Sequence, residues 1–294
     1  MIPGQEDFEA ELKAMLHDLL AAGSCLLRHG ISLVSAPPAW PQPIVNENRL
    51  SLHLSRGLLV KSCKLFRSAL WATGVGADET TQHIIRTMFE AATAMSFLTK
   101  ESLRLHGCEL TRAERAQIYS AHQAINFVRR LEDFGITPGI DLERVKTNAD
   151  NAKRAVGPEW ATRLSQRPRT YSGSNLKDLS HLLCSSLGRV YDSAYGPLSI
   201  KSHALDAGQH VTVDSSNFDT TPTWHPSVPD IANSFQMCSG LMGHTILCFG
   251  TQFKIQGFDR DEISTLLQAM HETVEQQFDA TTATDEEKNN DKHN

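Results

Sequence analysis

Residues 84–98 read IIRTMFEAATAMSFL, and this stretch is apolar on almost every side of a helical wheel. A helix that is apolar all round is buried on most of its surface. Only two charged residues interrupt it, Arg86 and Glu90, which stand four positions apart and therefore share one face. Removing one partner of a buried ion pair costs about 3–5 kcal/mol, so we expect these side chains to be paired or to border a cleft. The stretch predicts a central helix over residues 78–100.

Apolar residues at helical spacing continue on both sides of this central helix. They predict further helices over residues 6–20, 49–71, 111–134, 140–156, 175–195, 230–249 and 259–278. Thr111 followed by Glu114 has the form of a capping box, which places the start of one helix. We therefore expect an all-α, multi-helix bundle with a long irregular loop near residues 208–229.

Composition divides the chain into four parts. Residues 1–35 are expected to form an N-terminal helical arm, and residues 36–48, which contain APPAWPQP, a proline-rich linker. Residues 49–278 form the main helical domain, and the polar residues 279–294 a disordered tail. With 294 residues and 40% hydrophobic content, the chain can bury a substantial core.

Charge and cysteine usage exclude several classes of protein. A formal net charge of −6 gives no whole-molecule attraction to nucleic acid or to an anionic membrane. The six cysteines form no C-x-x-C pair, which indicates reduced core thiols in a cytoplasmic protein. The first residues are acidic, unlike a usual signal peptide, and no apolar run reaches spanning length, so we expect no membrane partner.

A polar and aromatic stretch, YDSAYGPLSIKSH at residues 191–203, marks a point where two predicted helices meet. Gly196 suits the end of one helix and Pro197 the first turn of the next. Ser199 then lies in a first turn, where backbone N–H groups lack partners, and His203 follows one turn later on the same face. Such a corner can bind an anion or hold a proton-transfer group. It can equally be a packed corner whose polar side chains are satisfied.

Motifs in a fixed order carry a resemblance to a known family. Arg86-x-x-x-Glu90 comes first, then residues 160–187, then the motif Tyr-x-x-Leu-Ser-x-x-x-His that begins at Tyr195. Over about residues 49–209 the chain resembles an uncharacterised, all-helical bacterial family of unknown function. The resemblance implies no reaction. It implies a helical bundle with five residues that face a common interior: Arg86, Glu90, Tyr195, Ser199 and His203.

The end of this motif is also similar to that of some members of the HEPN superfamily of helical RNases and toxin partners. In those proteins an arginine and a histidine on one helix cleave RNA without a metal. The best match to that pair in this chain is Arg115 and His122, with six residues between them on the helix predicted over 111–134.

A serine hydrolase would use Ser199 as nucleophile, His203 as base, and Asp192, Asp206 or Glu90 to orient the base. The sequence disfavours this assignment because it contains no G-x-S-x-G elbow and no alternation of strands and helices. A metal site is disfavoured as well, because the candidate histidines lack a diagnostic short spacing; they are His203, His210, His225 and His244. Fingerprints of phosphate loops and dinucleotide sites are absent, so we expect no metal and no cofactor.

Two hypotheses of function remain open, and the sequence does not decide whether the chain is an enzyme. The first is an uncharacterised cytoplasmic helical module that binds a small anionic ligand or a protein partner at the corner of Arg86, Glu90, Tyr195, Ser199 and His203. The second is a metal-independent, HEPN-like RNase, a toxin or phage-defence component. It would use His203 or His122 as acid and base, and Arg86 or Arg115 to stabilise phosphate charge. We favour the first because the resemblance names no reaction and the chain is acidic.

Overall fold

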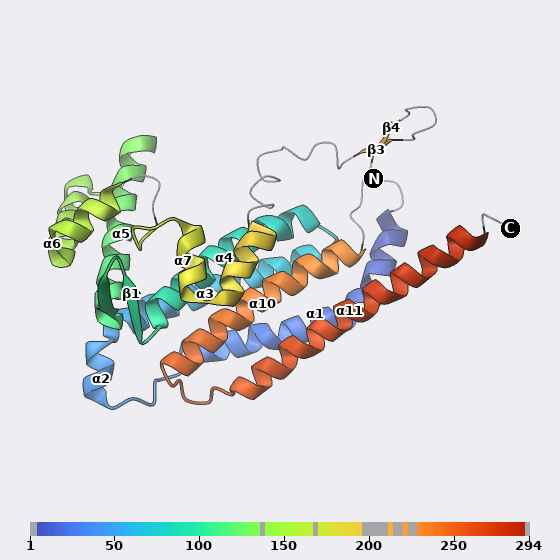
Figure 1. The fold of residues 1–294 in the computed structure, drawn as a ribbon, viewed down its shortest axis with the longest axis horizontal. Coiled ribbons are helices and arrows are strands. Elements are labelled where there is room, and N and C mark those ends of the chain that lie inside the picture. The colour runs from blue at the N-terminus through green and yellow to red at the C-terminus, as the bar shows by residue number, and fades with distance from the viewer. Residues whose placement is uncertain are drawn as a thin grey trace.

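Long helices lying side by side form the body of the computed structural model, which describes residues 5–135, 139–166, 170–195, 211–213, 220–222 and 228–291 (Figure 1). These helices are α1 (Gln5–Val34), α3 (Arg49–Gly74), α4 (Asp78–Thr99), α10 (Val228–Gln252) and α11 (Arg260–Asp291). α4 packs against α3 and α10, while α1 packs against α3, α10 and α11. The predicted all-α, multi-helix bundle is confirmed.

α4 lies at the centre of the hydrophobic core. Phe89, Met95 and Phe97 are fully buried on it, at 0% exposed. Next to it, Phe66 of α3 stacks on Phe235 of α10 with ring centroids 5.5 Å apart. Burying such a side chain contributes about 1.5–3 kcal/mol, so this layer is a main source of stability. The central helix predicted over residues 78–100 is confirmed to within one residue at its end.

α1 is much longer than the helix predicted over residues 6–20, because its glycines are contact positions and not breaks. A Cβ atom on Gly30 would overlap Met242 of α10 and would lie 3.0 Å from the sulfur of Cys63 on α3. A Cβ atom on Gly23 would likewise lie only 2.6 Å from the Phe235 ring. Glycine at these sites lets α1 approach two helices closely, so the helix continues to Val34 as part of the same core.

The proline-rich segment 36–48 packs on the turn between α10 and α11. Ala39 donates its backbone N–H to the Lys254 carbonyl at 2.8 Å, and the Trp40 ring lies 5.4 Å from that of Phe253. A short helix, α2 (Gln42–Glu47), follows within the segment that was predicted to be only a linker.

A β-hairpin that the sequence analysis missed leads into the helix predicted at residues 111–134. Strands β1 (Ser102–Leu105) and β2 (Cys108–Thr111) pair antiparallel through a turn in which His106 and Gly107 both have positive φ, at 50° and 83°. Two positive φ angles match the right-handed twist of a tight hairpin. Helix α5 (Arg112–Phe134) starts directly after β2.

The predicted capping box at the start of α5 is confirmed. The backbone N–H of Glu114 donates to the Thr111 hydroxyl at 3.2 Å, and the backbone N–H of Thr111 donates to the Glu114 carboxylate at 2.7 Å. Each bond satisfies one of the amide groups that a helix start leaves without partners.

We expect Thr111→Ala to lower the free energy of unfolding by about 1 kcal/mol, since it removes the N-cap acceptor. Urea unfolding followed by circular dichroism measures this change. The matched control is Thr147→Ala, at an exposed site inside helix α6 (Leu142–Ser165), where alanine favours the helix slightly. An equal loss in both variants would contradict a capping role.

α6 is longer than predicted: the sequence analysis expected this helix to end at residue 156. α6 bends at Gly157, whose φ is 82°, and continues to Ser165, with Pro158 in the first turn after the bend. Trp160 lies against the ring of His106 in the hairpin turn, with centroids 5.7 Å apart. Tyr171 is buried between Phe97 and Tyr119, with each ring centroid 5.0 Å away.

The helix predicted over residues 175–195 is divided into α7 (Leu176–Leu183), α8 (Ser185–Val190) and a π-helical turn, η1 (Tyr191–Tyr195). The break falls at Cys184, whose backbone is extended at φ −161° and ψ 134°. Farther on, β3 (Val211–Val213) and β4 (Thr220–Pro222) pair antiparallel inside the loop predicted near residues 208–229. The rest of that loop before Val228 lies outside the described residues.

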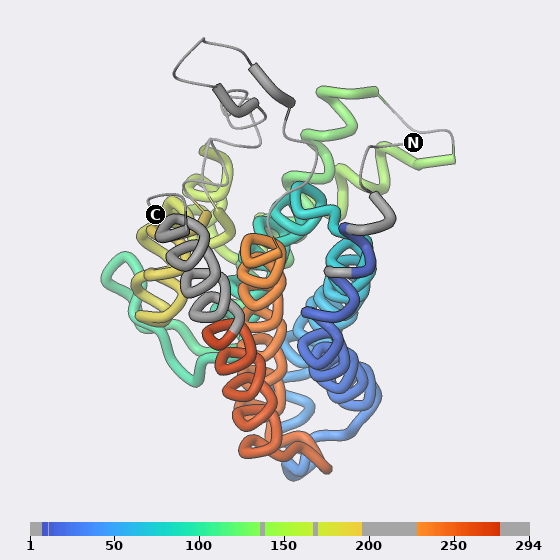
Figure 2. Tube along the Cα trace, turned by 90° about the vertical axis from the view of Figure 1, so that its right-hand side faces the viewer, coloured from blue at the N-terminus to red at the C-terminus, as the bar shows by residue number. Residues whose placement is uncertain are grey.

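α11 continues to Asp291, into the segment that was predicted to be a disordered tail from residue 279. Figure 2 shows the bundle from its end, with α11 next to α10. In the part of the chain that the structure describes, no helix combines the length and the apolar character that crossing a membrane requires.

Candidate functional site

A line of contacts holds the segment from α7 to η1 along α4. At one end, the ammonium group of Lys100 donates a hydrogen bond to the carbonyl of Leu183 at 3.2 Å. At the other, the rings of Tyr191 and Tyr195 lie 6.0 Å and 5.0 Å from that of Phe89 on α4. Figure 1 shows α7 lying against α4. The segment therefore brings η1 next to the face of α4 that carries the two charged residues.

Three of the five residues predicted for the polar corner meet there. The hydroxyl of Tyr195 donates to the Glu90 carboxylate at 3.1 Å, and the guanidinium of Arg86 lies 5.5 Å from the centre of the Tyr195 ring. The Nε atom of Arg86 lies 3.9 Å from the same Glu90 oxygen. We call this group the Arg86–Glu90–Tyr195 corner. The prediction that the two charged side chains of α4 are paired is confirmed, by a loose contact between neighbouring turns.

The corner lies at the surface and not in the interior of the bundle. The side chains of Arg86 and Glu90 are 36% and 49% exposed. Partial burial raises the pKa of Tyr195, and the Glu90 charge adds to this shift, while the hydrogen bond and charge of Arg86 oppose it. The phenol is therefore a hydrogen-bond donor at neutral pH. The pairing that the sequence analysis expected is therefore found on a partly exposed face of α4.

The other two predicted residues, Ser199 and His203, lie outside the described residues, as do Gly196 and Pro197 between them and η1. The corner that the sequence predicts is thus described up to Tyr195, and the contribution of Ser199 and His203 stays a prediction. The same holds for the serine-hydrolase assignment, which depends on both.

The alternative pair, Arg115 and His122, lies inside the molecule. Arg115 is 0% exposed and donates to the backbone carbonyls of Phe97, Lys100 and Leu110. His122 is 9% exposed, beside Asn126, whose side-chain nitrogen lies 2.9 Å from its Nε2 atom. An arginine that stabilises phosphate charge must reach its substrate, whereas the guanidinium of Arg115 is engaged by the protein backbone. This geometry favours a structural role for Arg115.

Sequence analysis missed a part-buried polar cluster between α4 and α10. The hydroxyl of Ser96 lies 2.7 Å from Nε2 of His244, and the sulfur of Cys248 lies 3.4 Å from the same nitrogen. Burial lowers the pKa of His244 to about 4 and raises that of Cys248 to about 11. At neutral pH the imidazole and the thiol are therefore both uncharged. The sequence does point to this cluster, because His244 is a histidine on an otherwise apolar helix. The sequence analysis considered His244 only as a ligand of the metal site that it disfavours.

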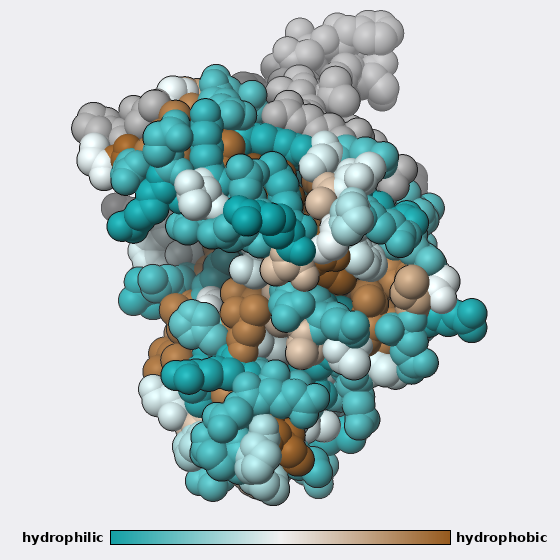
Figure 3. All heavy atoms as spheres, turned by 90° about the vertical axis from the view of Figure 1, so that its left-hand side faces the viewer, coloured by the Kyte–Doolittle hydropathy of each residue, from teal (hydrophilic) through white to brown (hydrophobic). Residues whose placement is uncertain are grey.

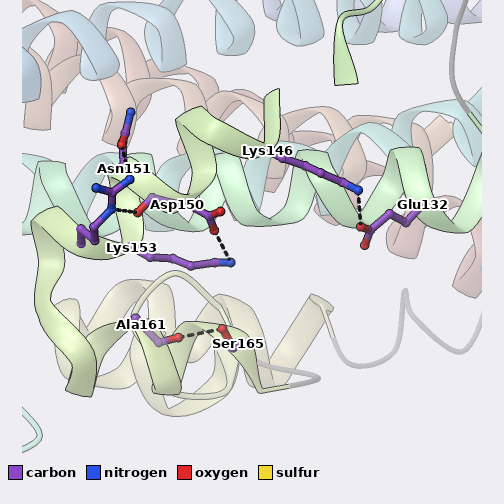
Figure 4. A network of polar contacts seen from close by, with 8 residues as sticks. Glu132, Lys146, Asp150, Asn151, Lys153, Ala161 and Ser165 are labelled. Atoms are coloured by element: carbon purple, nitrogen blue, oxygen red, sulfur yellow. Dashed lines mark hydrogen bonds and ion pairs between the residues drawn. The ribbon is translucent and has the colours of Figure 1, made fainter. Parts of the chain in front are cut away.

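A polar cleft of about 280 Å³ lies between α5 and α6, at the end of the molecule that Figure 3 shows covered mostly by hydrophilic residues. Figure 4 shows how its charged side chains are engaged: Lys146 reaches Glu132 at 3.8 Å and Lys153 reaches Asp150 at 3.1 Å. Each lysine of the cleft is therefore paired with a carboxylate, as Arg86 is paired with Glu90 at the corner.

Nothing in the described ranges brings three or more histidine, cysteine, aspartate or glutamate side chains together as a metal site would need. His203, His210 and His225 of the disfavoured metal set lie outside those ranges. All six cysteines are free thiols, but the expectation that they are core residues is wrong for Cys108, which is exposed.

Comparison with known protein families matches residues 52–219 to a family described as a family of unknown function, DUF5677. The match spans more than half of the chain and includes the corner. No curated protein and no solved structure matches the chain significantly.

Proposed function

We propose the following role for this chain, which belongs to the family of unknown function DUF5677: it is a cytoplasmic helical module that binds an oxyanion at the Arg86–Glu90–Tyr195 corner. The oxyanion is a carboxylate or a phosphate, carried by a small ligand or by a protein partner. The observation that carries this proposal is the half-exposed guanidinium of Arg86, held in place by the phenol of Tyr195 and by Glu90.

Arginine suits this role because its planar guanidinium presents several N–H donors and can bind an oxyanion in a bidentate manner. The ring of Tyr195 supports the guanidinium from one side, at 5.5 Å from its centroid. Glu90 holds the phenol as a donor through the bond of 3.1 Å. A guanidinium fixed in this way loses less side-chain entropy on binding than a freely moving one.

The position of the corner at a π-helical turn adds support. Single π-helical turns inside helical segments occur frequently at functional sites. η1 aligns Tyr191 and Tyr195 so that their rings stack at 5.1 Å, and both cover Phe89. Because Ser199 and His203 follow Tyr195 by one and two helical turns of sequence, we propose that they complete the binding site.

The proposal is tested by thermal melting and calorimetric titration with inorganic phosphate and with acetate. At a ligand concentration of about 100 Kd, the folded protein gains about 2.7 kcal/mol, so the melting temperature should rise. We expect Arg86→Gln to abolish this rise and Tyr195→Phe to reduce it. Arg104→Gln, at an exposed site on β1, is the matched control and should keep the rise.

Either of two results would remove the proposal: no stabilisation of the wild-type protein by these anions, or an equal rise in the Arg86→Gln variant. Loss of binding in His203→Ala, at an unchanged melting temperature without ligand, would support the part assigned to that histidine.

The RNase hypothesis is the alternative, and it requires activity without a metal. The exposed Arg86 suits a binding role or a catalytic one, whereas Arg115 is engaged by three carbonyls. RNA cleavage that survives a chelator and disappears in His203→Ala or His122→Ala, at an unchanged melting temperature, would replace binding by catalysis as the function of this chain.

A further inference from the structure

Two helices on one edge of the bundle carry no acidic residue over long stretches. α3 contains neither aspartate nor glutamate in its 26 residues, and it carries five cations, which are Arg49, Arg56, Lys61, Lys64 and Arg67. α1 has no acidic residue after Asp18. Because the chain as a whole has a net charge of −6, this edge is a local basic region on an acidic protein. Figure 2 shows α1 and α3 side by side at one edge of the bundle.

An apolar groove of about 310 Å³ runs between these two helices, and we call it the α1–α3 groove. Its lining comes from Leu27, Ile31 and Val34 of α1, from Ser35 directly after it, and from Val60, Cys63, Lys64 and Arg67 of α3. Two large apolar side chains stand at this surface: Ile31 is 56% exposed, and Trp71, one helical turn beyond Arg67, is 68% exposed. Exposed apolar residues around a hollow with a polar rim are typical of interaction sites.

The cations beside the groove are available to a partner. Lys61, Lys64 and Arg67 are exposed, and none of them forms an ion pair with another residue in the described ranges. Lys64, Arg67 and Trp71 lie on one face of α3, because they are spaced by three and four positions. The groove therefore has an apolar floor with one basic side.

We propose that the α1–α3 groove binds an amphipathic helix of a partner protein, with acidic residues next to the apolar face of that helix. A groove between two helices accepts a row of apolar side chains at positions i, i+3 or i+4, and i+7 of a bound helix. Acidic residues beside that row meet Lys64 and Arg67, which adds specificity and a faster association rate. We choose a protein helix over a lipid surface because the apolar floor between the two helices is concave. Ile31 and Trp71 are nevertheless exposed, so the test must also separate a membrane surface from a protein partner.

The test uses a fluorescein-labelled helical peptide of about 18 residues, or five turns. Leucines form one face of the peptide and glutamates flank them. One matched peptide has lysine in place of each glutamate, and another has serine in place of each leucine. In fluorescence anisotropy we expect the acidic peptide to bind, and each matched peptide to bind at least about tenfold more weakly. Binding should weaken with rising salt, because the charge pairs are at the surface.

The variants assign this binding to the groove. We expect Lys64→Glu combined with Arg67→Glu, and separately Ile31→Ser, to weaken binding of the acidic peptide at least about tenfold. The matched control, Arg104→Glu combined with Arg189→Glu, reverses two exposed charges elsewhere and should bind as the wild type does. All these sites are exposed, so thermal melting should show folded variants. Arg86→Gln should also bind the peptide normally, which keeps this proposal separate from the proposed oxyanion site.

Three results would overturn the proposal. The first is that the acidic peptide fails to bind or binds the charge-reversed variant equally well. The second is binding to phosphatidylserine vesicles that depends on Lys64 and Arg67, with no peptide binding, which would assign the edge to a membrane surface. The third is self-association in analytical ultracentrifugation that Ile31→Ser abolishes, which would assign the groove to a second copy of this chain.

Discussion

Replacing Arg115 with methionine is expected to lower the free energy of unfolding by about 3–5 kcal/mol, the largest single effect that we expect in this protein. The side chain is 0% exposed and donates to the carbonyls of Phe97 and Lys100 at the end of α4, and to that of Leu110 on β2. The last carbonyls of a helix have no partner within the helix. Arg115 therefore caps the central helix from outside and ties it to the hairpin.

The magnitude follows from two opposing contributions. Each buried carbonyl left without a donor costs about 1–3 kcal/mol, which for three carbonyls amounts to about 3–9 kcal/mol. Part of that loss is offset because methionine removes a buried charge. Burial, together with the neighbouring charge of Arg112, lowers the pKa of Arg115 to about 10, while Glu114 opposes the shift. The guanidinium remains charged at neutral pH, so its hydrogen bonds to the carbonyls are charge-assisted and strong.

Urea unfolding compares Arg115→Met with Arg104→Met, which removes an exposed arginine on β1 and should change the free energy of unfolding by less than about 0.5 kcal/mol. Arg115→Lys should also be clearly destabilised, because an ammonium group cannot reproduce the fork that reaches three carbonyls. Equal stability of the Arg115→Met variant and the wild type would contradict the capping role.

This structural role also affects how the RNase hypothesis is tested. Loss of activity in an Arg115 variant would report unfolding, so the His122 variant is the informative one of that pair.

The helices could be predicted where apolar spacing was continuous, and less well where tertiary contacts decide the structure. α4 was predicted to within one residue because the nearly continuous apolar character of residues 84–98 is visible in the sequence. α1 was predicted too short, because Gly23 and Gly30 weaken the apolar pattern but serve close packing on Phe235 and Met242. A single sequence does not distinguish a glycine that ends a helix from one that lets another helix approach.

The hairpin before α5 was missed for a related reason. Each strand has only four residues, and their apolar residues, among them Leu103, Leu105 and Leu110, are buried as part of the hydrophobic core. The capping box at Thr111 was visible because both of its residues are local in sequence. Local hydrogen bonds can thus be predicted from spacing, whereas short strands depend on what packs against them.

The candidate site shows the same limit. The sequence predicted that Arg86 and Glu90 are paired or border a cleft, but it did not show that their face of α4 is partly exposed. Tyr195 lies more than a hundred positions away in sequence. Its contact with Arg86 and Glu90 was expected only because the family resemblance implies it. The α1–α3 groove was not predicted, since it arises from the packing of two helices whose residues look unremarkable one at a time.

Acidification is expected to destabilise the protein through His244, and this is the second large effect. Burial lowers the pKa of this imidazole in the folded protein to about 4, below its ordinary value of 6.5. Between these two values the unfolded chain binds a proton that the folded protein excludes, so the free energy of unfolding falls as the pH falls. The shift corresponds to about 3 kcal/mol, lost progressively from pH 6.5 to pH 4 and fully present above this range.

The His244→Gln variant tests this assignment, because glutamine has no proton to gain and can still contact the hydroxyl of Ser96. We expect its urea unfolding curves to lose much less stability than those of the wild type between pH 6.5 and pH 4. Ser96→Ala is the matched control: it removes the contact of 2.7 Å but leaves the imidazole between α4 and α10, so the loss of stability in acid should persist. Parallel pH profiles of the wild type and His244→Gln would show that other groups cause the acid sensitivity. A difference of about 3 kcal/mol would instead identify His244, neutral in the folded protein at neutral pH, as the group that causes the loss of stability in acid.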